Sequence, residues 1–148
     1  MEDCIFCKIV KGEIPCEKIY EDEKVFAFLD ISPSNPGHTL VILKEHSADL
    51  MHSPEEHLAE LITRVPAIAQ AVMSGLDYPA FILSVNNGSE AGQVVPHLHF
   101  HIIPRKTGDG LIHFSKRSYA EGEMHEVAEK IRLAFKKNFF SGSCCRSF

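Results

Sequence analysis

Three histidines alternate with apolar residues in the segment His97-Leu98-His99-Phe100-His101. Successive side chains of a β-strand point to opposite faces, so this spacing predicts a strand with three imidazoles on one face and the intervening apolar residues in the core. One edge of a sheet would then carry all three imidazoles. A single buried histidine is usually structural, whereas three in register beside a loop containing glycine indicate a chemical site.

Two kinds of chemistry fit this strand. A His-X-His pair on a strand can bind zinc in catalytic sites, although this leaves a third histidine to place and requires an open coordination position. A neutral imidazole can also attack phosphorus and later be displaced by water, which divides one difficult displacement into two easier ones. The preceding loop, Asn86 to Gln93, favours the second chemistry, because Gly92 lets the backbone approach a phosphate and neighbouring N–H groups can bind its oxygens.

The pair Cys4-X-X-Cys7 forms half of a potential zinc site, and two further ligands must come from elsewhere in the chain. The chain has 5 cysteines, and its first residues lack the charged and apolar regions of a signal peptide. An odd number of cysteines without an export signal argues against a disulfide framework. We therefore expect a cytoplasmic protein whose thiols are reduced or bound to metal.

The composition limits what surrounds these residues. With 148 residues, 45% of them hydrophobic, the chain suits one compact domain with a real core. Its formal net charge of -5, with scattered lysines and arginines, provides no basic surface for a nucleic acid, and no stretch is apolar enough to span a membrane. Any phosphate must therefore be bound by local groups.

Short runs of apolar residues predict the strands that position the site. They cover residues 17–20 and 24–29, joined by an acidic turn, then 39–43, 80–85 and the histidine segment. A main helix is expected from Ser53, with this serine as its cap, Pro54 at its first position and a glutamate three residues after the cap. Pro66 should kink or break this helix, and Gly75 is a plausible stop.

A second amphipathic pattern predicts a C-terminal helix over residues 124–135, followed by a loose tail over residues 141–148. The fold class is therefore α+β, with an about five-stranded, mostly antiparallel meander sheet, a main helix and a C-terminal helix. We expect residues 1–140 to form a single domain.

The chain closely resembles the histidine triad (HIT) family, whose signature His-φ-His-φ-His-φ-φ, with φ apolar, is matched throughout by residues 97–103. The similarity extends through residues 4–9, 28–31, 37–41 and 86–93. It implies a HIT-like fold and a nucleotide hydrolase or transferase of the bacterial-type branch, acting at the α-phosphate of a purine nucleotide that we expect to contain adenylate. Members of this size usually form symmetric homodimers, and the apolar face between Leu58 and Met73 offers the only support in the sequence.

The resemblance also assigns catalytic roles. His99 takes the place of the nucleophile, and the backbone carbonyl of His97 would hold its ring in the tautomer whose other nitrogen faces phosphorus. His101 and Asn86 would hydrogen-bond the α-phosphate or the leaving group. The phosphate cradle would be formed by the backbone of Gly92, Gln93 and Val94.

Further positions match the nucleoside-binding residues of the family. Asp30 would accept hydrogen bonds from the ribose hydroxyls. The base pocket would be lined mainly by Phe6, Leu29 and Ile31. Members that cleave phosphoramidates often carry serine where this chain has Val94, so assistance to the leaving group would fall to His101, Gln93 or a water.

By the same resemblance, Cys4 and Cys7 would bind structural Zn²⁺ together with His46 and His97. Two thiolates and two imidazoles would complete a closed tetrahedral site and leave His99 free of metal, so that no catalytic metal is required. Arg105, just beyond the histidine strand, is a candidate for contact with distal phosphates. His38 and the other remaining histidines match no defined role.

Three functions follow for comparison. The first is an enzyme that releases a nucleoside monophosphate from a phosphoramidate, a mixed anhydride or a dinucleoside polyphosphate through a nucleotidyl-His99 intermediate. The second is a nucleotide-binding regulatory or scaffold protein with little turnover. The third is a metal-dependent hydrolase in which His97, His99 and His101 are all ligands.

Overall fold

The computed structural model describes residues 4–111, 119–128 and 131–132. The chain divides into two compact units, Met1–Leu111 and Ile112–Phe148. The first unit contains the sheet, two helices and every residue for which the sequence predicts a role in catalysis or binding. Each unit is described by itself.

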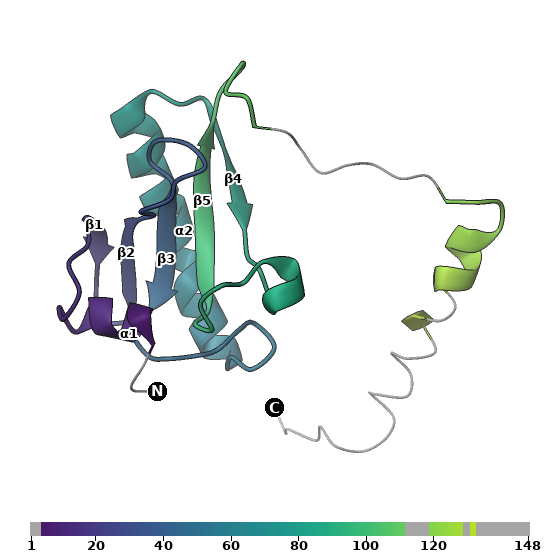
Figure 1. The fold of residues 1–148 in the computed structure, drawn as a ribbon, viewed down its shortest axis with the longest axis horizontal. Helices are drawn as coiled ribbons and strands as arrows, with labels where there is room; N and C mark the ends of the chain where they lie inside the picture. The colour runs from purple at the N-terminus through teal and green to yellow at the C-terminus, as the bar shows by residue number, and fades with distance from the viewer. Residues whose placement is uncertain (1–3, 112–118, 129–130, 133–148) are drawn as a thin grey trace. The chain divides into compact units, whose positions relative to one another are not determined.

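The first unit is built on a five-stranded sheet with the order β1-β2-β3-β5-β4 and antiparallel neighbours (Figure 1). The strands are β1 (Lys18–Glu21), β2 (Val25–Leu29), β3 (Thr39–Leu43), β4 (Ala80–Ser84) and β5 (His99–Arg105). The predicted five-stranded antiparallel sheet is thus confirmed, but it is not a simple meander, because β5 lies between β3 and β4. The expectation that the histidines lie at a sheet edge is wrong, because β5 pairs on both sides. Both faces of β5 are covered, whereas β4 carries the exposed side chains that suit an edge strand.

One face of the sheet packs against the main helix α2 (Glu55–Leu76). Leu98, Phe100 and Ile102 enter this core, so the predicted alternation along the histidine segment is confirmed. The other buried members of the core are Val25, Ala27, Val41, Leu43, Leu61, Val65, Ile68 and Ala69. The histidines therefore face the opposite side of the sheet.

The boundaries of α2 differ from the sequence prediction at three points. Pro54 is its N-cap, and the Ser53 hydroxyl instead donates to the carbonyl of Asp49. The helix continues without a break past Pro66, because packing of its apolar face offsets the one backbone hydrogen bond that proline removes. It also passes Gly75, and Asp77 takes the left-handed conformation at its end with φ 55°. Aspartate adopts that conformation more readily than most residues.

The opposite face of the sheet is covered by the short helix α1 (Ile5–Val10). Phe6 and Ile9 pack there against Phe26, Phe28, Leu40 and Ile42. The sequence patterns did not predict this helix, because six residues are too few to reveal helical periodicity. A helix this short is not stable by itself, so tertiary contacts must hold it.

In the second unit, residues 123–128 and 131–132 are helical, which agrees with the first part of the predicted C-terminal helix. The rest of that helix and the predicted tail, residues 141–148, lie outside the described residues. The single domain over residues 1–140 stays a prediction. Among the helices in the described segments, none is both long and apolar enough to cross a bilayer.

Candidate active site

The ring of His99 is held in one tautomer by the backbone. Its Nδ1 lies 2.6 Å from the carbonyl oxygen of His97, and since a carbonyl only accepts, Nδ1 must carry the hydrogen. In the neutral ring, Nε2 then keeps its lone pair. The imidazole is 6% exposed and meets the ring of Phe6 edge-to-face, with centroids 5.2 Å apart. The orientation of the His99 ring is thus fixed, and in the neutral ring Nε2 is the nitrogen that carries the lone pair.

A second hydrogen-bond chain ends at His101. The N–H of Ser34 donates to Nδ1 of His38 at 3.2 Å, so the other nitrogen of His38 carries the hydrogen. That nitrogen, Nε2, lies 2.9 Å from Nδ1 of His101 and donates to it. Nε2 of His101 therefore carries a hydrogen, and it is buried without a partner among the described residues. The chain ends on a donor that can serve a substrate oxygen or a leaving group.

His38 and His101, the two histidines of this hydrogen-bond chain, are neutral near pH 7. Burial, reinforced by the neighbouring His99 and His38, lowers the pKa of His101 to about 4. Burial also lowers the pKa of His38, although the nearby carboxylate of Asp30 opposes this effect. The donor at His101 is therefore a neutral imidazole N–H rather than an imidazolium.

His38 is the functional residue that the sequence reasoning missed. It directly precedes β3, and its burial at 4% exposure places it beside the sheet rather than in solvent. The signal was present in the sequence: alternation puts His38 on the same face as Leu40 and Ile42, which lie with Phe6 under α1. That face is the one shared by His99.

Asp30 lies next to His38, as the end of β2 and the start of β3 are paired. Its Oδ2 is 3.6 Å from Nδ1 of His38, beyond hydrogen-bond distance, and its Oδ1 accepts from the N–H of Ser32 at 2.8 Å. The carboxylate is only partly exposed. It retains acceptor capacity for a ligand beside the histidines.

The three predicted base-pocket residues have different environments. Phe6 is buried against the rings of His97 and His99. Leu29 is half-buried at the end of β2, whereas Ile31 is 95% exposed. Their contact with a base stays a prediction.

The loop before the histidines is shaped by two glycines with positive φ, Gly88 at 86° and Gly92 at 82°, which flank the short helix η1 (Ser89–Ala91). A Cβ at Gly92 would lie 3.3 Å from Nδ2 of Asn86, so glycine permits the close approach of these two predicted phosphate ligands. The side chain of Val94 is 90% exposed. The loop therefore leaves the neighbourhood of Val94 open to solvent.

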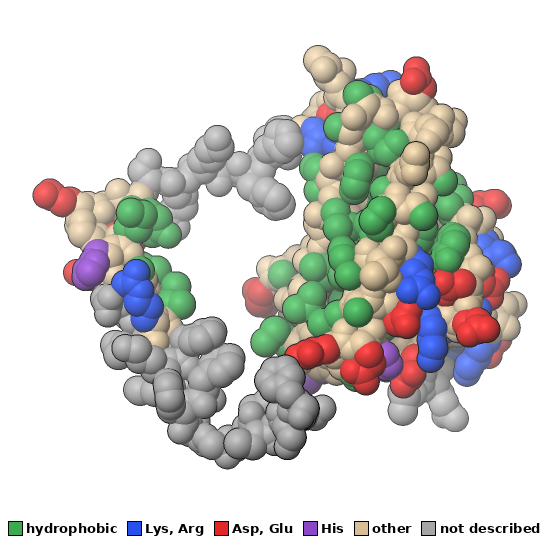
Figure 2. Space-filling view, turned by 180° about the vertical axis from the view of Figure 1, so that it is seen from behind, with side chains coloured by type: hydrophobic (Ala, Val, Ile, Leu, Met, Phe, Trp, Pro, Cys, Tyr) green, Lys and Arg blue, Asp and Glu red, His purple; other side chains and the backbone are tan. Residues whose placement is uncertain are grey.

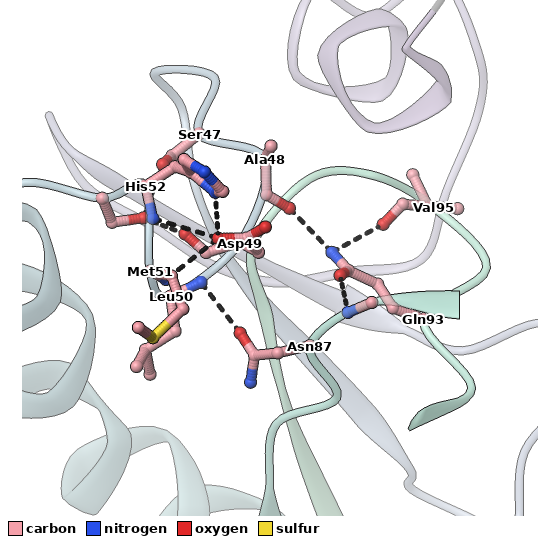
Figure 3. A network of polar contacts seen from close by, with 11 residues as sticks. Ser47, Ala48, Asp49, Leu50, Met51, His52, Asn87, Gln93 and Val95 are labelled. Atoms are coloured by element: carbon pink, nitrogen blue, oxygen red, sulfur yellow. Dashed lines mark hydrogen bonds and ion pairs between the residues drawn. The ribbon is translucent and has the colours of Figure 1, made fainter. Parts of the chain in front are cut away.

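The side chain of Gln93 is committed to this loop (Figure 3). Its Oε1 accepts from the N–H of Gly88 at 2.8 Å, while its Nε2 donates to the carbonyls of Ala48 at 2.7 Å and Val95 at 3.2 Å. The amide is fully used in tying the loop together. The suggestion that it assists the leaving group is therefore wrong, which leaves His101 or a water for that task.

On the far side of His97, four potential metal ligands converge. Nδ1 of His97 lies 3.4 Å from Sγ of Cys4 and 3.6 Å from Sγ of Cys7, and Nδ1 of His46 lies 3.4 Å from Sγ of Cys7. All four ligand atoms lie within 4.8 Å of one another. Nε2 of His97 donates to the carbonyl of Leu43 at 2.9 Å, which leaves Nδ1 unprotonated and directed at the thiols.

This donor set fits Zn²⁺. Two thiolates with two imidazoles form the closed tetrahedral arrangement of structural zinc sites, and a backbone acceptor on the far nitrogen is the usual support for a ligating histidine. Burial lowers the pKa of His97 to about 4, so the ring is neutral as a ligand must be. Burial and the neighbouring Cys4 raise the pKa of the Cys7 thiol, an effect that a bound cation would oppose.

The three histidines of the strand do not form one chelating set. Within the described ranges, the clusters of potential ligands are the group just described and a second group of Asp30, His38 and His101. His99 belongs to neither. The predicted alternative of a metal held jointly by His97, His99 and His101 therefore has no geometric support.

Arg105 is also committed elsewhere. Its Nε and one terminal nitrogen donate to the two oxygens of Asp109 at 2.6 and 3.0 Å, and that nitrogen also donates to the carbonyl of Leu111 at 2.9 Å. The guanidinium lowers the pKa of the buried Asp109 carboxyl. To bind a ligand, the guanidinium would have to give up both bonds to Asp109, so Arg105 is not a free cation for distal phosphates.

The fold and the site together define a class of small α+β proteins in which a central strand presents a tautomerically fixed histidine. The HIT domain family matches residues 11–108, and the chain belongs to this family. An uncharacterized HIT-like protein of Methanocaldococcus jannaschii is 50% identical over 107 residues, 72% of this chain and 82% of that protein. The adenylylsulfatase HINT3 of Arabidopsis thaliana is 46% identical over 109 residues, 74% of this chain but 55% of that protein. The adenosine 5'-monophosphoramidase hnt1 of Schizosaccharomyces pombe is 45% identical over 102 residues, 69% of this chain and 74% of its own.

Solved structures agree with this assignment. A protein from Streptococcus mutans UA159 superposes with a TM-score of 0.84 at 41% identity, covering 91% of this chain and 87% of its own. A zinc-bound histidine triad family protein from Mycobacterium smegmatis superposes with a TM-score of 0.72 at 37% identity, covering 90% of this chain and 97% of its own. The HIT fold is therefore established for this chain. Two of its relatives carry the names of hydrolases, an adenylylsulfatase and an adenosine 5'-monophosphoramidase.

Proposed function

We propose that the protein is a hydrolase or transferase that releases adenylate from a phosphoramidate, a mixed anhydride or a dinucleoside polyphosphate through a nucleotidyl-His99 intermediate. The observation that carries this proposal is the hydrogen bond from Nδ1 of His99 to the carbonyl of His97. It leaves Nε2 with a lone pair in a buried setting, which is what attack on phosphorus requires.

In the first step, Nε2 of His99 forms a bond to the α-phosphorus as the bond from phosphorus to the leaving group breaks. The N–H at Nε2 of His101, which lacks a partner among the described residues, supports a role in donating to the leaving group or to a phosphate oxygen. In the second step, water displaces the imidazole and adenylate is released. Asn86 and the backbone of Gly92, Gln93 and Val94 would stabilise charge on the phosphate, and Asp30 would accept from the ribose.

The names of two relatives support the substrate class. One is called an adenylylsulfatase and another an adenosine 5'-monophosphoramidase, and both names describe cleavage next to an adenylate phosphorus. The exposed valine at position 94 offers no side-chain proton, so the leaving group of this chain is to be found by assay. A panel of adenylated and guanylated substrates would define both the leaving group and the base.

Cys4, Cys7, His46 and His97 would hold Zn²⁺ as a structural ion. When bound, the ion would supply a crosslink between α1 and the ends of β3 and β5. No step of the proposed mechanism involves this ion, because His99 lies outside its ligand set. The cytoplasmic location expected from the cysteines stays a proposal.

We also propose that the protein is a homodimer formed through α2 and the edge strand β4. A groove of about 450 Å³ runs between them, and it is lined by Ile62, Val65, Pro66, Ala69, Gln70, Met73, Phe81 and Leu83. Apolar side chains gather over this face in Figure 2. An unpaired strand edge beside an apolar groove favours association with a second copy.

The test of the catalytic proposal is to incubate the protein with adenosine phosphoramidate and diadenosine polyphosphates and to measure adenylate release. We expect release to vanish in His99→Ala, and mass spectrometry of quenched reactions to find an adenylyl group on His99. Full activity of His99→Ala would exclude the mechanism. Tight nucleotide binding with negligible turnover of every substrate would instead favour the regulatory or scaffold function.

A further inference from the structure

We propose that metal binding at Cys4, Cys7, His46 and His97 is thermodynamically coupled to nucleotide binding. The reason is that these ligands are connected both to Phe6 on α1 and to the loop of residues 86–93, which lie on two sides of the proposed nucleotide site. The proposal rests on the nucleotide function above and extends it to the metal. In this proposal the bound ion holds residues of the nucleotide site in position, in addition to stabilising the fold. Two structural routes connect the centre to the site.

The first route runs through α1. Cys4 and Cys7 bracket Phe6, whose ring meets those of His97 and His99 with centroids 5.8 and 5.2 Å apart. A helix of six residues cannot hold its own conformation, so its position depends on burial of Phe6 and Ile9 and on the two thiols. A metal bound to both thiols therefore fixes the ring that packs on the nucleophile.

The backbone of His97 strengthens this route. The same residue supplies a ligand atom, Nδ1, and the carbonyl oxygen that holds Nδ1–H of His99 at 2.6 Å. Its side chain is completely buried and is anchored by Leu43 on its other nitrogen. A shift in the backbone of His97 would therefore alter both the metal centre and the hydrogen bond that fixes the tautomer of His99.

The second route runs through the loop that begins at His46. The carbonyl of Ser47 accepts from the N–H of Leu98 at 2.6 Å, and the carbonyl of Ala48 accepts from the side chain of Gln93 at 2.7 Å. The N–H of Leu50 donates to the side chain of Asn87 at 2.9 Å. The bonds of Ala48 and Leu50 join the loop after His46 to the loop of residues 86–93, as Figure 3 shows.

Thermodynamic linkage between the two binding events predicts a change in affinity that can be measured. If metal binding orders residues that the nucleotide needs, adenylate and metal must raise each other's affinity by the same factor. We expect a factor of about ten, which lies within the usual range for coupled sites. The reciprocity provides a test that does not depend on the activity of the metal-loaded enzyme.

The first experiment measures Zn²⁺ affinity by competition with a chromophoric chelator, with and without saturating adenosine monophosphate. We expect the nucleotide to tighten zinc binding about tenfold. Adenylate that binds the protein without changing its zinc affinity would overturn the coupling but leave the proposed function intact. Adenylate that fails to bind at all would overturn the proposed function itself.

The second experiment needs no nucleotide. Backbone hydrogen exchange is measured on the zinc-loaded and metal-free protein, and we expect metal removal to accelerate exchange at residues 5–10 and 88–95 while β2 and β3 stay protected. Exchange at residues 88–95 that is unaffected by zinc would contradict the second route. Loss of protection throughout β2 and β3 would make the metal a requirement for folding as a whole and would also overturn the proposal.

One variant separates the two routes. Gln93→Ala keeps every metal ligand but removes the hydrogen bond to Ala48, so zinc should still protect residues 5–10 but protect residues 88–95 less than in the unmodified chain. Cys16→Ser is the matched control, because Cys16 is a partly buried free thiol packed near α1 but outside the ligand group. It should respond to zinc as the unmodified chain does. Equal protection of residues 88–95 in both variants would overturn the role assigned to Gln93.

Discussion

His38 and His101 form a pair in which each ring defines the hydrogen position of the next. Ser34 donates to His38, His38 donates to His101, and His101 is left with a donor directed at no protein group in the described segments. Because neither ring is an imidazolium near pH 7, His101 can donate a hydrogen bond without bringing a positive charge to the site. Such a bond stabilises negative charge that develops on the leaving group. The proton that an amine leaving group takes up must come from water, because loss of a proton would leave this neutral pair as an imidazolate.

Replacing His38 by asparagine should therefore lower kcat by roughly 10²-fold, the lower range for loss of a prepositioned hydrogen-bond donor or its support. The loss should be large for a poor leaving group such as an alkylamine and small for an activated one such as a nitrophenolate. Measuring kcat across such a series of adenylate derivatives checks this. A deficit of equal size for every leaving group would show that His38 supports the fold rather than the hydrogen bond from His101 to the leaving group.

The depressed pKa of His101 predicts a pH dependence of stability. Burial lowers it from 6.5 to about 4 in the folded protein, so between these values the unfolded chain binds more protons. The contribution of His101 to the free energy of unfolding is fully present above pH 6.5 and is lost as the pH falls toward 4. We expect the free energy of unfolding to drop by roughly 1 to 3 kcal/mol over this interval on its account.

Urea unfolding of the metal-free protein at a series of pH values would measure this slope. His101→Asn should flatten it, whereas His52→Asn should not, because the side chain of His52 is 75% exposed. An unchanged slope in His101→Asn would mean that other groups carry the acid sensitivity.

At the scale of elements, the features that could be predicted from the sequence are the strands whose residues alternate or form an apolar run. The residues of β3 were predicted without error, and the alternation in β5 correctly separated core from site. The sequence patterns did not predict α1, because this helix is too short to show a period. They also placed β5 at a sheet edge, because strand order depends on contacts between distant segments. Alternation does place His38 on the face of Leu40 and Ile42, but its hydrogen bond to His101, 63 residues away, is a contact that periodicity does not show.

The turn before β3 offers a sharper test of element packing. Gly37 has φ 87°, and a Cβ there would lie 2.3 Å from Cδ1 of Leu76 at the end of α2 and 3.3 Å from Pro104. Gly37→Ala should therefore suffer backbone strain, and the end of the Leu76 side chain must move aside while the Pro104 ring leaves little room. We expect it to destabilise the protein by about 2 to 3 kcal/mol. It should also weaken nucleotide binding, because the turn connects Asp30 to His38.

Gly12→Ala is the control for this prediction. Gly12 has φ 77°, but no atom lies within 4 Å of the position that its methyl group would take, so only the backbone strain of about 1 to 2 kcal/mol applies. Thermal or urea unfolding of both variants measures the difference. Equal losses would show that the helix end moves to accommodate the methyl group.

At the scale of the whole molecule, the two edges of the sheet differ in their surroundings. β1 ends in a charged network in which Lys18 and Lys44 bind Glu21, and these hydrogen bonds lower the pKa of the Glu21 carboxyl to about 2. Such charges discourage pairing with another strand. β4 instead borders the apolar groove against α2, which makes it the edge expected to meet a second copy.

A glutamate at Leu83 should therefore separate the dimer. Leu83 is 40% exposed on β4, and a two-fold interface would bring two copies of the new charge into an apolar contact. We expect the dissociation constant to rise at least about 100-fold, because burying each unpaired charge costs several kcal/mol. Ile19→Glu is the matched control, since Ile19 is 42% exposed on the opposite edge strand. Light scattering over a dilution series should find Leu83→Glu monomeric and Ile19→Glu dimeric, and a Leu83→Glu protein that dimerises as tightly as the unmodified chain would place the interface elsewhere.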